Sequence, residues 1–306
     1  MRPPPPAILY ALPVHRRLAD ALVERTGVEP GGAAIGRFAN GELHVELDAV
    51  PGGRDGVVLG AVAPPDEHLL STLLLAHTLK KEGARRVTAC LPYLGYARHD
   101  RAEPRKSRAT AWLGEVLRAS GVDAVLAIDV HSSLLHRLFP IPVVSVSPAA
   151  LFAAEIAPLA LVDPVVVAPD QGARERGEAV RAAAGIGRPL AHLTKTRTAA
   201  GVRHSVLHGA VGPEAVIVED ILDTGGTLVS ACEALQAAGV RQIVVMATHG
   251  LFTGTAWERL WSLGVTRIYT TDSTPRPASL LDPRLTVLCV TPLLAGALAA
   301  RGGPEG

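Results

Sequence analysis

Short apolar runs alternate along the chain with longer segments in which apolar residues recur at helical spacing. Residues 87–91 form one such run, whereas leucines recur every three or four positions across residues 68–82. The apolar runs predict strands at residues 57–62, 87–91, 124–130, 165–168, 216–218 and 243–247. The periodic segments predict helices at residues 68–82, 109–119, 174–184, 228–238 and 292–300. This alternation is typical of parallel sheets with right-handed helical crossovers.

The two halves of the chain share a short residue pattern. A Leu-x3-Gly-x-Arg sequence precedes a predicted strand at residues 79–85 and again at residues 235–241, about half a chain length later. A glycine between a helix and a strand is also ordinary in α/β proteins, so the pattern leaves duplication and coincidence equally open. We predict two similar α/β domains, joined near residues 142–148.

Composition narrows the class of protein. Of the 306 residues, 48% are apolar and 19% charged, which allows a sizeable core and excludes wholesale disorder. Thirty Lys and Arg balance 29 Asp and Glu, which argues against a polybasic nucleic-acid binder. Three cysteines without CxxC spacing fit a reducing compartment, and no apolar run is long enough for a signal peptide or a membrane span. We expect a cytoplasmic protein that binds neither nucleic acid nor membrane.

Residues 216–227 combine an apolar strand, two acids and a glycine-rich turn that leads into a helix. Glycines let the backbone approach an anion, and threonine hydroxyls and helix N-terminal amides can donate to it. Glu219 and Asp220 would instead accept from sugar hydroxyls or orient a hydrated Mg²⁺. The alternative is an ordinary capped turn. A site for a phosphate next to a site for sugar hydroxyls, however, indicates that the ligand is a phosphorylated pentose. The predicted cradle consists of Asp223, Thr224, Gly225, Gly226 and Thr227.

Two further segments have the composition of nucleotide-binding loops. Residues 93–108 follow a predicted strand, where open α/β folds bind ligands, and hold five cations that suit a polyphosphate. Near the N-terminus, Phe38, Asn40 and Glu42 occupy a glycine-flanked turn that could stack an adenine and read its edge. From the residues alone, a β-turn with one core phenylalanine is the favoured interpretation. The five cations are Arg98, Arg101, Arg105, Lys106 and Arg108.

Together these segments resemble the ribose-phosphate pyrophosphokinase family. Residues 216–227 are similar to the phosphoribosyl pyrophosphate motif that this family shares with phosphoribosyltransferases. Four other segments separate the two groups, run through nearly the whole chain and match the pyrophosphokinases: residues 36–42, 92–101, 129–131 and 169–172. The activity that the resemblance implies converts ATP and ribose 5-phosphate into phosphoribosyl pyrophosphate and AMP, with Mg²⁺ as cofactor.

The resemblance also implies an architecture. It predicts an α/β fold of two phosphoribosyltransferase-like domains, each a mainly parallel sheet flanked by helices. Residues 1–146, completed by a C-terminal helix at residues 291–306, would bind ATP, and residues 147–290 would bind ribose 5-phosphate. The implied assembly is a homo-oligomer built from dimers, a hexamer in the family.

Individual residues take roles by the same resemblance. Lys195 and Arg197, followed by a pliable Ala-Ala-Gly segment, resemble the family's flexible catalytic loop; an exposed edge strand is the alternative. His131 and Asp170 fall where the family binds Mg²⁺. The implied ATP contacts are Phe38, Asn40, Gly41, Glu42, Arg98 and His99, and the adenine loop often belongs to a neighbouring subunit. The implied ribose 5-phosphate contacts are Arg197, Glu219, Asp220, Asp223, Thr224, Gly225, Gly226 and Thr227.

The chain departs from the family pattern at several positions. Asn40, His99 and Glu219 replace the usual Asp, Gln and Asp. Arg176 stands at the family's Arg position, but its neighbours differ from the usual apolar pattern, so we predict no role for it. Two rival functions stay open. A phosphoribosyltransferase would share the cradle but would need neither nucleotide loop, and a non-catalytic regulatory homologue would keep the fold without the activity.

Overall fold

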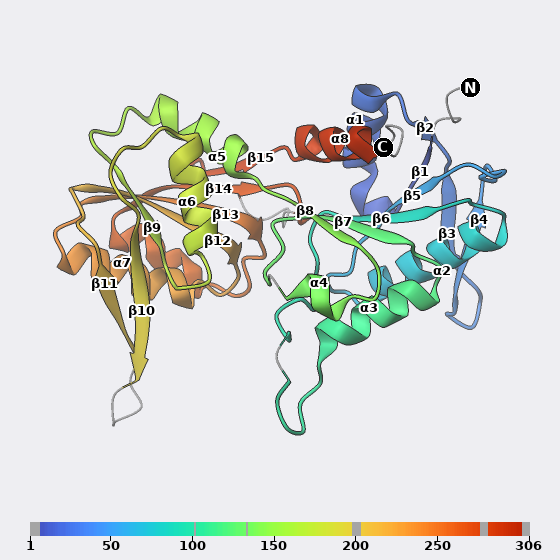
Figure 1. Ribbon diagram of the computed structural model, residues 1–306, viewed down its shortest axis with the longest axis horizontal. Coiled ribbons are helices and arrows are strands. Elements are labelled where there is room, and N and C mark those ends of the chain that lie inside the picture. The colour runs from blue at the N-terminus through green and yellow to red at the C-terminus, as the bar shows by residue number, and fades with distance from the viewer. Residues whose placement is uncertain (1–6, 101, 133, 198–202, 276–280, 302–306) are drawn as a thin grey trace. The chain divides into compact units, whose positions relative to one another are not determined.

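The computed structural model describes residues 7–100, 102–132, 134–197, 203–275 and 281–301, with only the backbone of residues 195–197, 203–205 and 301. The chain divides into two compact units. The first unit consists of Met1–Val146 and Thr291–Gly306, and the second unit of Ser147–Val290. In each, helices cover a mainly parallel sheet, as the sequence predicted (Figure 1). No helix within the described ranges has the length and apolar character that a membrane span requires.

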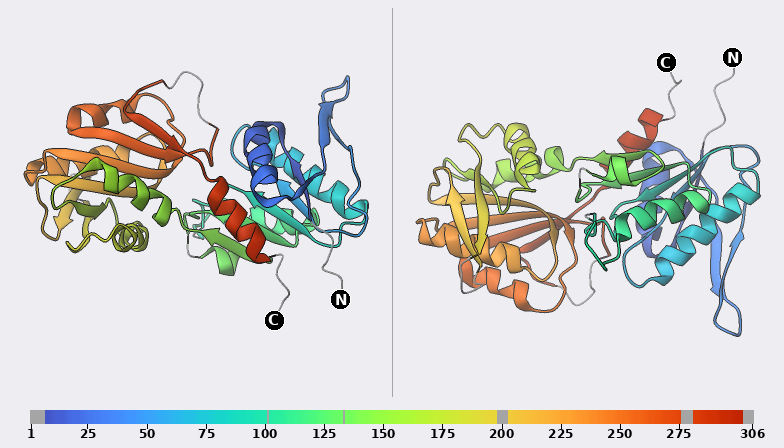
Figure 2. Two further views of the ribbon diagram at one scale, coloured as in Figure 1. Left: turned by 90° about the horizontal axis from the view of Figure 1, so that it is seen from above. Right: turned by 60° about the horizontal axis from the view of Figure 1, so that its bottom comes forward.

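The sheet of the first unit has six parallel strands in the order β2-β1-β5-β6-β7-β8. The central strands β5, β6 and β7 are wholly buried, as continuous apolar runs covered on both faces should be. Helices α1 and α8 lie together on one face, and α2 and α3 cover the other (Figures 1 and 2). The strands are β1 (Ile8–Ala11), β2 (Glu29–Pro30), β5 (Gly56–Leu59), β6 (Val87–Leu91), β7 (Ala124–Ile128) and β8 (Val143–Val146). The helices are η1 (Pro13–His15), α1 (Arg16–Thr26), α2 (Glu67–Lys81), α3 (Ala109–Ala119), α4 (Leu135–Leu138) and α8 (Thr291–Arg301).

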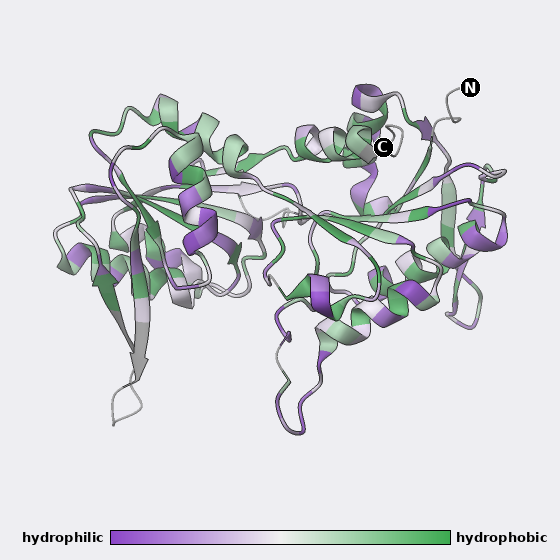
Figure 3. Ribbon diagram, viewed as in Figure 1, coloured by the Kyte–Doolittle hydropathy of each residue, from purple (hydrophilic) through white to green (hydrophobic). Residues whose placement is uncertain are grey.

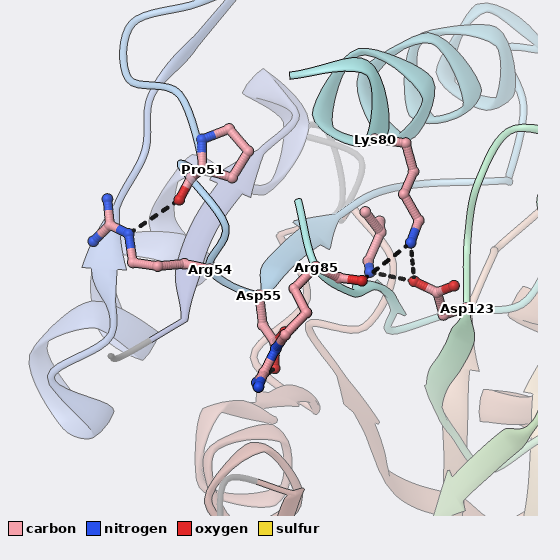
Figure 4. Close-up of polar contacts among 7 residues, drawn as sticks. Pro51, Arg54, Asp55, Lys80, Arg85 and Asp123 are labelled. Atoms are coloured by element: carbon pink, nitrogen blue, oxygen red, sulfur yellow. Dashed lines mark hydrogen bonds and ion pairs between the residues drawn. The ribbon is translucent and has the colours of Figure 1, made fainter. Parts of the chain in front are cut away.

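Ion pairs and hydrogen bonds fasten the amino edge of this sheet, where β5 and β6 begin (Figure 4). Asp55 accepts from Nε and Nη2 of Arg85, each at 2.9 Å. Asp123 Oδ2 lies 2.7 Å from both the Val87 amide nitrogen and Lys80 Nζ. The charged groups of this edge are therefore paired with one another, and open α/β sheets bind ligands at the opposite, carboxyl edge.

The sheet of the second unit has seven strands in the order β11-β10-β9-β12-β13-β14-β15, parallel except for the pair β10 and β11. The strands are β9 (Val165–Ala168), β10 (Ala191–Arg197), β11 (Arg203–His208), β12 (Glu214–Leu222), β13 (Gln242–Gly250), β14 (Val265–Thr271) and β15 (Leu285–Leu288). The helices are α5 (Ala149–Ile156), η2 (Ala157–Leu159), α6 (Arg174–Ala183), α7 (Gly226–Ala237) and η3 (Ala256–Leu263).

Two apolar clusters sandwich this second sheet. Phe152 of α5 and Val180 of α6 pack on one face, and Leu235 of α7 and Leu260 of η3 pack on the other. Coloured by hydropathy, the strands of this sheet are largely green, and purple positions alternate with green ones along α6 and α7 (Figure 3). Burial of both faces explains why the central strands read as uninterrupted apolar runs in the sequence.

The two units repeat one plan. In each, five parallel strands neighbour one another in chain order, β1-β5-β6-β7-β8 and β9-β12-β13-β14-β15. In each, an antiparallel hairpin is inserted between the first and second of these strands: β10 and β11 in the second unit, β3 (Ala33–Arg37) and β4 (Leu43–Leu47) in the first. The shared Leu-x3-Gly-x-Arg pattern leads from α2 into β6 and from α7 into β13, which occupy corresponding places in the two sheets. This correspondence supports internal duplication.

Several predicted elements differ from those observed. The segments 87–91, 109–119 and 165–168 are predicted with the observed bounds, whereas β12 and β13 extend further at both ends than the apolar runs indicated. The expected joining segment near residues 142–148 contains strand β8, because its valines complete the sheet of the first unit.

Candidate active site

The predicted phosphate cradle lies where β12 passes into α7, at the carboxyl edge of the second sheet. Gly226 begins α7, is exposed, and an added Cβ there would meet no atom within 4 Å. Amides in the first turn of a helix lack intrahelical acceptors, so they can donate to an anion in this open space. Thr224 is exposed, and Asp223 and Thr227 are half-buried. The local backbone thus has the form that anion binding requires.

Gly225 has a packing role that the sequence did not predict. Its φ is +84°, and an added Cβ would lie 2.7 Å from Trp257 Cα in η3. Glycine is therefore needed at this position for backbone conformation and for the close approach of η3. Of the two glycines in the turn, Gly226 faces the open space and Gly225 supports the packing beneath it.

The two acids that precede the cradle are both buried. Oε1 of Glu219 accepts a hydrogen bond from the backbone amide of Asp220 at 2.9 Å, so this carboxyl group is folded back on its own chain. Burial raises the pKa of Glu219, and the neighbouring Asp220 and Asp170 raise it further, while Arg176 lowers it. Asp220 forms an ion pair, because Arg176 Nη2 lies 3.6 Å from its Oδ2.

Asp170 follows β9, the strand next to β12 in the sheet. Its Oδ1 accepts from the amide of Ala173 at 3.1 Å, which satisfies a donor at the start of α6. Asp170 is half-buried and close enough to Glu219 to raise its pKa. The structure therefore brings Asp170, Glu219, Asp220 and the cradle to one edge of one sheet, as expected for neighbouring parallel strands.

Lys195 and Arg197 occupy a strand instead of the expected loop. Both belong to β10, with Lys195 opposite Ser205 and Arg197 opposite Arg203 of β11. Among the described residues, β10 pairs with β9 only through Ala191 and His192, so the rest of β10 and β11 forms a two-stranded ribbon that leaves the sheet (Figure 1). The pliable residues expected at 199–201 lie outside the described residues.

In the first unit, the predicted adenine turn is the tip of the β3–β4 hairpin. The Phe38 amide donates to the Glu42 carbonyl at 2.9 Å, and the Gly41 amide donates to the Phe38 carbonyl at 2.8 Å. Asn40 Oδ1 accepts from the Glu42 amide at 3.1 Å, so its oxygen is used within the turn. Phe38 is 58% exposed, which rules out the core phenylalanine that the sequence alone favoured.

The basic segment before α3 is hydrophilic along most of its length (Figure 3). Arg98 and His99 are exposed, and Arg101 lies outside the described residues. Asp100 Oδ2 accepts from Ser132 Oγ at 2.5 Å, and Ser132 follows directly after His131. This contact brings the predicted ATP loop beside the predicted metal-binding histidine, which is exposed beyond the end of β7.

Sequence reasoning missed Arg176. We predicted no role for this residue, yet its side chain is 11% exposed and pairs with Asp220, whose side chain is 7% exposed. The signal was its match to the family's Arg position, which the unusual neighbours obscured. One of those neighbours, Gly177, has a packing reason: an added Cβ would lie 2.9 Å from Leu190 Cδ1. The missing side chain leaves room for the end of the Leu190 side chain beside α6.

Comparisons with known proteins cover nearly the whole chain. Residues 7–121 match the family described as the N-terminal domain of ribose phosphate pyrophosphokinase, and residues 196–300 match the phosphoribosyl synthetase-associated domain. The ribose-phosphate pyrophosphokinase of Chromobacterium violaceum is 33% identical over 288 residues, covering 92% of this chain and 87% of that protein. The chain belongs to the ribose-phosphate pyrophosphokinase family.

Two further members of the ribose-phosphate pyrophosphokinase family are similar to this chain over almost its full length. The Bacillus caldolyticus enzyme is 30% identical over 95% of this chain and 93% of its own length. The crystal structure of phosphoribosylpyrophosphate synthetase from Mycobacterium smegmatis superposes with a TM-score of 0.88 at 30% identity, covering 97% of this chain and 99% of that chain. Membership confirms the predicted family and its two-domain α/β fold. It also disfavours the phosphoribosyltransferase alternative, since the match includes the N-terminal domain that carries both predicted nucleotide loops.

Proposed function

We propose that the chain transfers the pyrophosphoryl group of ATP to the anomeric hydroxyl of ribose 5-phosphate. The hydroxyl oxygen forms a bond to the β-phosphorus, the bond from that phosphorus to the oxygen bridging to AMP breaks, and the hydroxyl proton is released to solvent. Family membership over nearly the full length is the observation that carries this proposal. Positioning and charge neutralisation supply most of the barrier reduction in such transfers.

Ribose 5-phosphate would bind at the carboxyl edge of the second sheet. Its phosphate would accept from the first-turn amides of α7 in the open space at Gly226, flanked by Thr224 and Thr227. Asp223, at the start of the turn, and Asp220 would accept from sugar hydroxyls. Glu219 and Gly225 would support the cradle from below, the first by folding onto the backbone and the second by admitting η3.

ATP would bind through residues of the first unit. Exposed Phe38 offers a ring for stacking on adenine, and the turn residues Asn40, Gly41 and Glu42 offer polar groups beside it. Exposed Arg98 and His99 would meet the phosphates. Arg37 holds the turn in shape, because its Nη1 donates to the Gly41 carbonyl at 2.7 Å.

Lys195 and Arg197 would neutralise charge on the reacting phosphoryl group, and Arg197 would also bind ribose 5-phosphate. Their place on a ribbon that leaves the sheet supports this proposal, because such a ribbon can bring cations to a substrate without disturbing the core. Positive charge that meets the developing negative charge in a water-poor site is worth far more than in bulk water.

Mg²⁺ is the proposed cofactor, with His131 and Asp170 as its protein ligands. Asp170 offers the carboxylate oxygens that Mg²⁺ prefers, at a strand end where ligands bind. Across the described part of the chain, no group of three or more His, Cys, Asp or Glu side chains could hold a metal ion. This fits an ion that keeps most of its waters and binds with the nucleotide phosphates. When bound, it would neutralise phosphate charge.

We also propose a homo-oligomer built from dimers, hexameric as the family resemblance implies, and a cytoplasmic location. Exposed apolar side chains in the first unit, Leu70, Leu74 and Trp112, support subunit contacts. None of the three cysteines, all of which lie within the described residues, forms a disulfide, as in a reducing compartment.

The deciding experiment identifies the products formed from ATP, ribose 5-phosphate and Mg²⁺. Release of AMP together with phosphoribosyl pyrophosphate is the expected result, and it should require both ribose 5-phosphate and the divalent ion. Formation of ADP would mean attack at the γ-phosphorus and would refute the proposal. No turnover by folded protein that binds both substrates would favour the regulatory homologue, and consumption of phosphoribosyl pyrophosphate with a free base would favour the phosphoribosyltransferase.

A further inference from the structure

A buried ion pair links helix α6 to the strand that ends in the cradle. Arg176, in the first turn of α6, reaches β12 and places Nη2 3.6 Å from Oδ2 of Asp220. Their side chains are 11% and 7% exposed. At this distance the contact is an ion pair more than a strong hydrogen bond. Removing one partner of a buried pair leaves the other charge uncompensated, so the two residues depend on each other.

The approach of α6 to the sheet makes this contact possible. At Gly177, next to Arg176, an added Cβ would lie 2.9 Å from Leu190 Cδ1 and 3.8 Å from Ala168 Cβ. The first of these atoms is the end of a flexible side chain, and the second lies at ordinary van der Waals distance, so this turn of α6 packs directly against β9 and Leu190. The start of α6 is also fixed from the neighbouring strand, because Asp170 Oδ1 accepts from the Ala173 amide. The guanidinium of Arg176 therefore extends from a helix end that is held by packing at Gly177 and by the hydrogen bond from the Ala173 amide to Asp170.

The neighbouring acid, Glu219, also experiences the charge of Arg176, but its carboxyl group has a backbone partner. Glu219 is turned back so that its Oε1 accepts from the Asp220 amide. The carboxylate oxygen Oδ2 of Asp220 faces Nη2 of Arg176. We propose that Arg176 is a positioning residue for the sugar substrate: it holds the Asp220 carboxylate in the orientation in which it can accept hydrogen bonds from the hydroxyls of a phosphorylated pentose. This inference rests on the proposed function, and it deepens the assignment of the sugar site.

The test compares Arg176→Gln with Arg176→Lys and with Arg174→Gln as a matched control. Arg174 lies on the same turn of α6, is exposed, and loses the same charge on substitution. Arg176→Gln should raise KM for ribose 5-phosphate about 10- to 100-fold, the loss of a well-held charged contact, while kcat stays within about threefold and KM for ATP is unchanged. Arg176→Lys should recover part of the loss, because it restores the charge but not the planar fork. Arg174→Gln should behave as wild type.

A double-mutant cycle separates positioning from a purely structural role. With Asp220→Asn already present, Arg176→Gln should change KM for ribose 5-phosphate by less than about twofold, because no carboxylate is left to position. An equal effect with and without Asp220→Asn would overturn the inference, as would an unchanged KM in Arg176→Gln. If Arg176→Gln does not fold, Arg176→Lys carries the cycle.

Direct binding keeps this result distinct from the proposed activity. Calorimetric titration with ribose 5-phosphate alone should show weaker binding for Arg176→Gln than for Arg174→Gln, whether or not the protein turns over. Wild-type protein that binds ribose 5-phosphate but forms no AMP would refute the proposed activity and leave the role of Arg176 intact. Equal binding by the two variants would refute the role of Arg176 even if AMP is formed.

Discussion

Substitution of Gly226 by alanine should stabilise the protein and damage its use of ribose 5-phosphate. Gly226 begins α7 without a left-handed φ, and an added methyl group would meet no protein atom within 4 Å. Alanine at such a position restricts the unfolded chain and favours the helix, which should add about 0.4–1 kcal/mol to the free energy of unfolding. The same methyl group would project into the space where we place the 5-phosphate, at the open amides of the first turn.

The expected cost to binding follows from the contacts that the methyl group displaces. Loss of one hydrogen bond to a charged phosphate is worth about 1.5–3 kcal/mol, or roughly 10- to 150-fold in KM for ribose 5-phosphate. Stability should be measured by thermal unfolding without ligands, where a gain of about 1 kcal/mol raises Tm by about 2–4 °C. KM and kcat come from AMP formation at varied ribose 5-phosphate and saturating ATP. KM for ATP should not change.

Gly225→Ala is the contrasting variant. Its φ of +84° and the 2.7 Å approach to Trp257 Cα make alanine strained at that position, so both stability and activity should fall. A more stable Gly226→Ala protein with an unchanged KM for ribose 5-phosphate would show that the open space at α7 is not the phosphate site. A less stable Gly226→Ala protein would contradict the local geometry on which the argument depends.

Three further substitutions test other parts of the molecule. Lys195→Ala should lower kcat about 10²- to 10³-fold and leave KM nearly unchanged, as for an interaction made mainly in the transition state; retention of half the wild-type kcat in steady-state assays would refute the role. Asn40→Asp should widen the preference for ATP over GTP in kcat/KM, because the Asn40 amide can donate to a guanine oxygen and a carboxylate cannot; equal discrimination would mean that Asn40 does not touch the base. Burial, with a smaller contribution from His68, lowers the pKa of His15 to about 4, so the unfolded chain takes up a proton that the folded chain resists. The stability that neutral His15 allows is therefore present above about pH 6.5 and lost as the pH falls toward 4. His15→Leu should flatten this part of the curve of unfolding free energy against pH. An unaltered curve would disprove the prediction.

The elements that local pattern alone determines were predicted from the sequence. Strands 87–91 and 165–168 are continuous apolar runs because both faces of each sheet are covered. Burial of this kind can be recognised from the sequence alone. The strand at Val143–Val146 was missed because prolines flank it and its two middle residues are exposed, so the segment resembles a linker. What makes it a strand is its parallel partner β7, which lies apart from it in the sequence.

The candidate site was predictable where residue type determines chemistry and unpredictable where packing does. The acids and the glycine-rich turn stand out in the sequence, but the different tasks of Gly225 and Gly226 depend on Trp257, which the sequence places far away. The pairing of Arg176 with Asp220 likewise requires α6 to lie against β12. The exposure of Phe38 reflects the position of its hairpin tip, and aromatic residues alone usually indicate a core.

Helix α8 is the last element of the chain to be synthesised, although it belongs to the first unit. It packs on α1, with Leu294 fully buried, yet it is translated only after the whole second unit has been made. Domains generally fold as they leave the ribosome, N-terminal part first. Here the second unit is contiguous and can fold as soon as it emerges, whereas the nascent first unit must wait with the α8-facing surface of α1 open to water and to chaperones. The order in which the two units reach full stability is therefore the reverse of the order in which translation begins them.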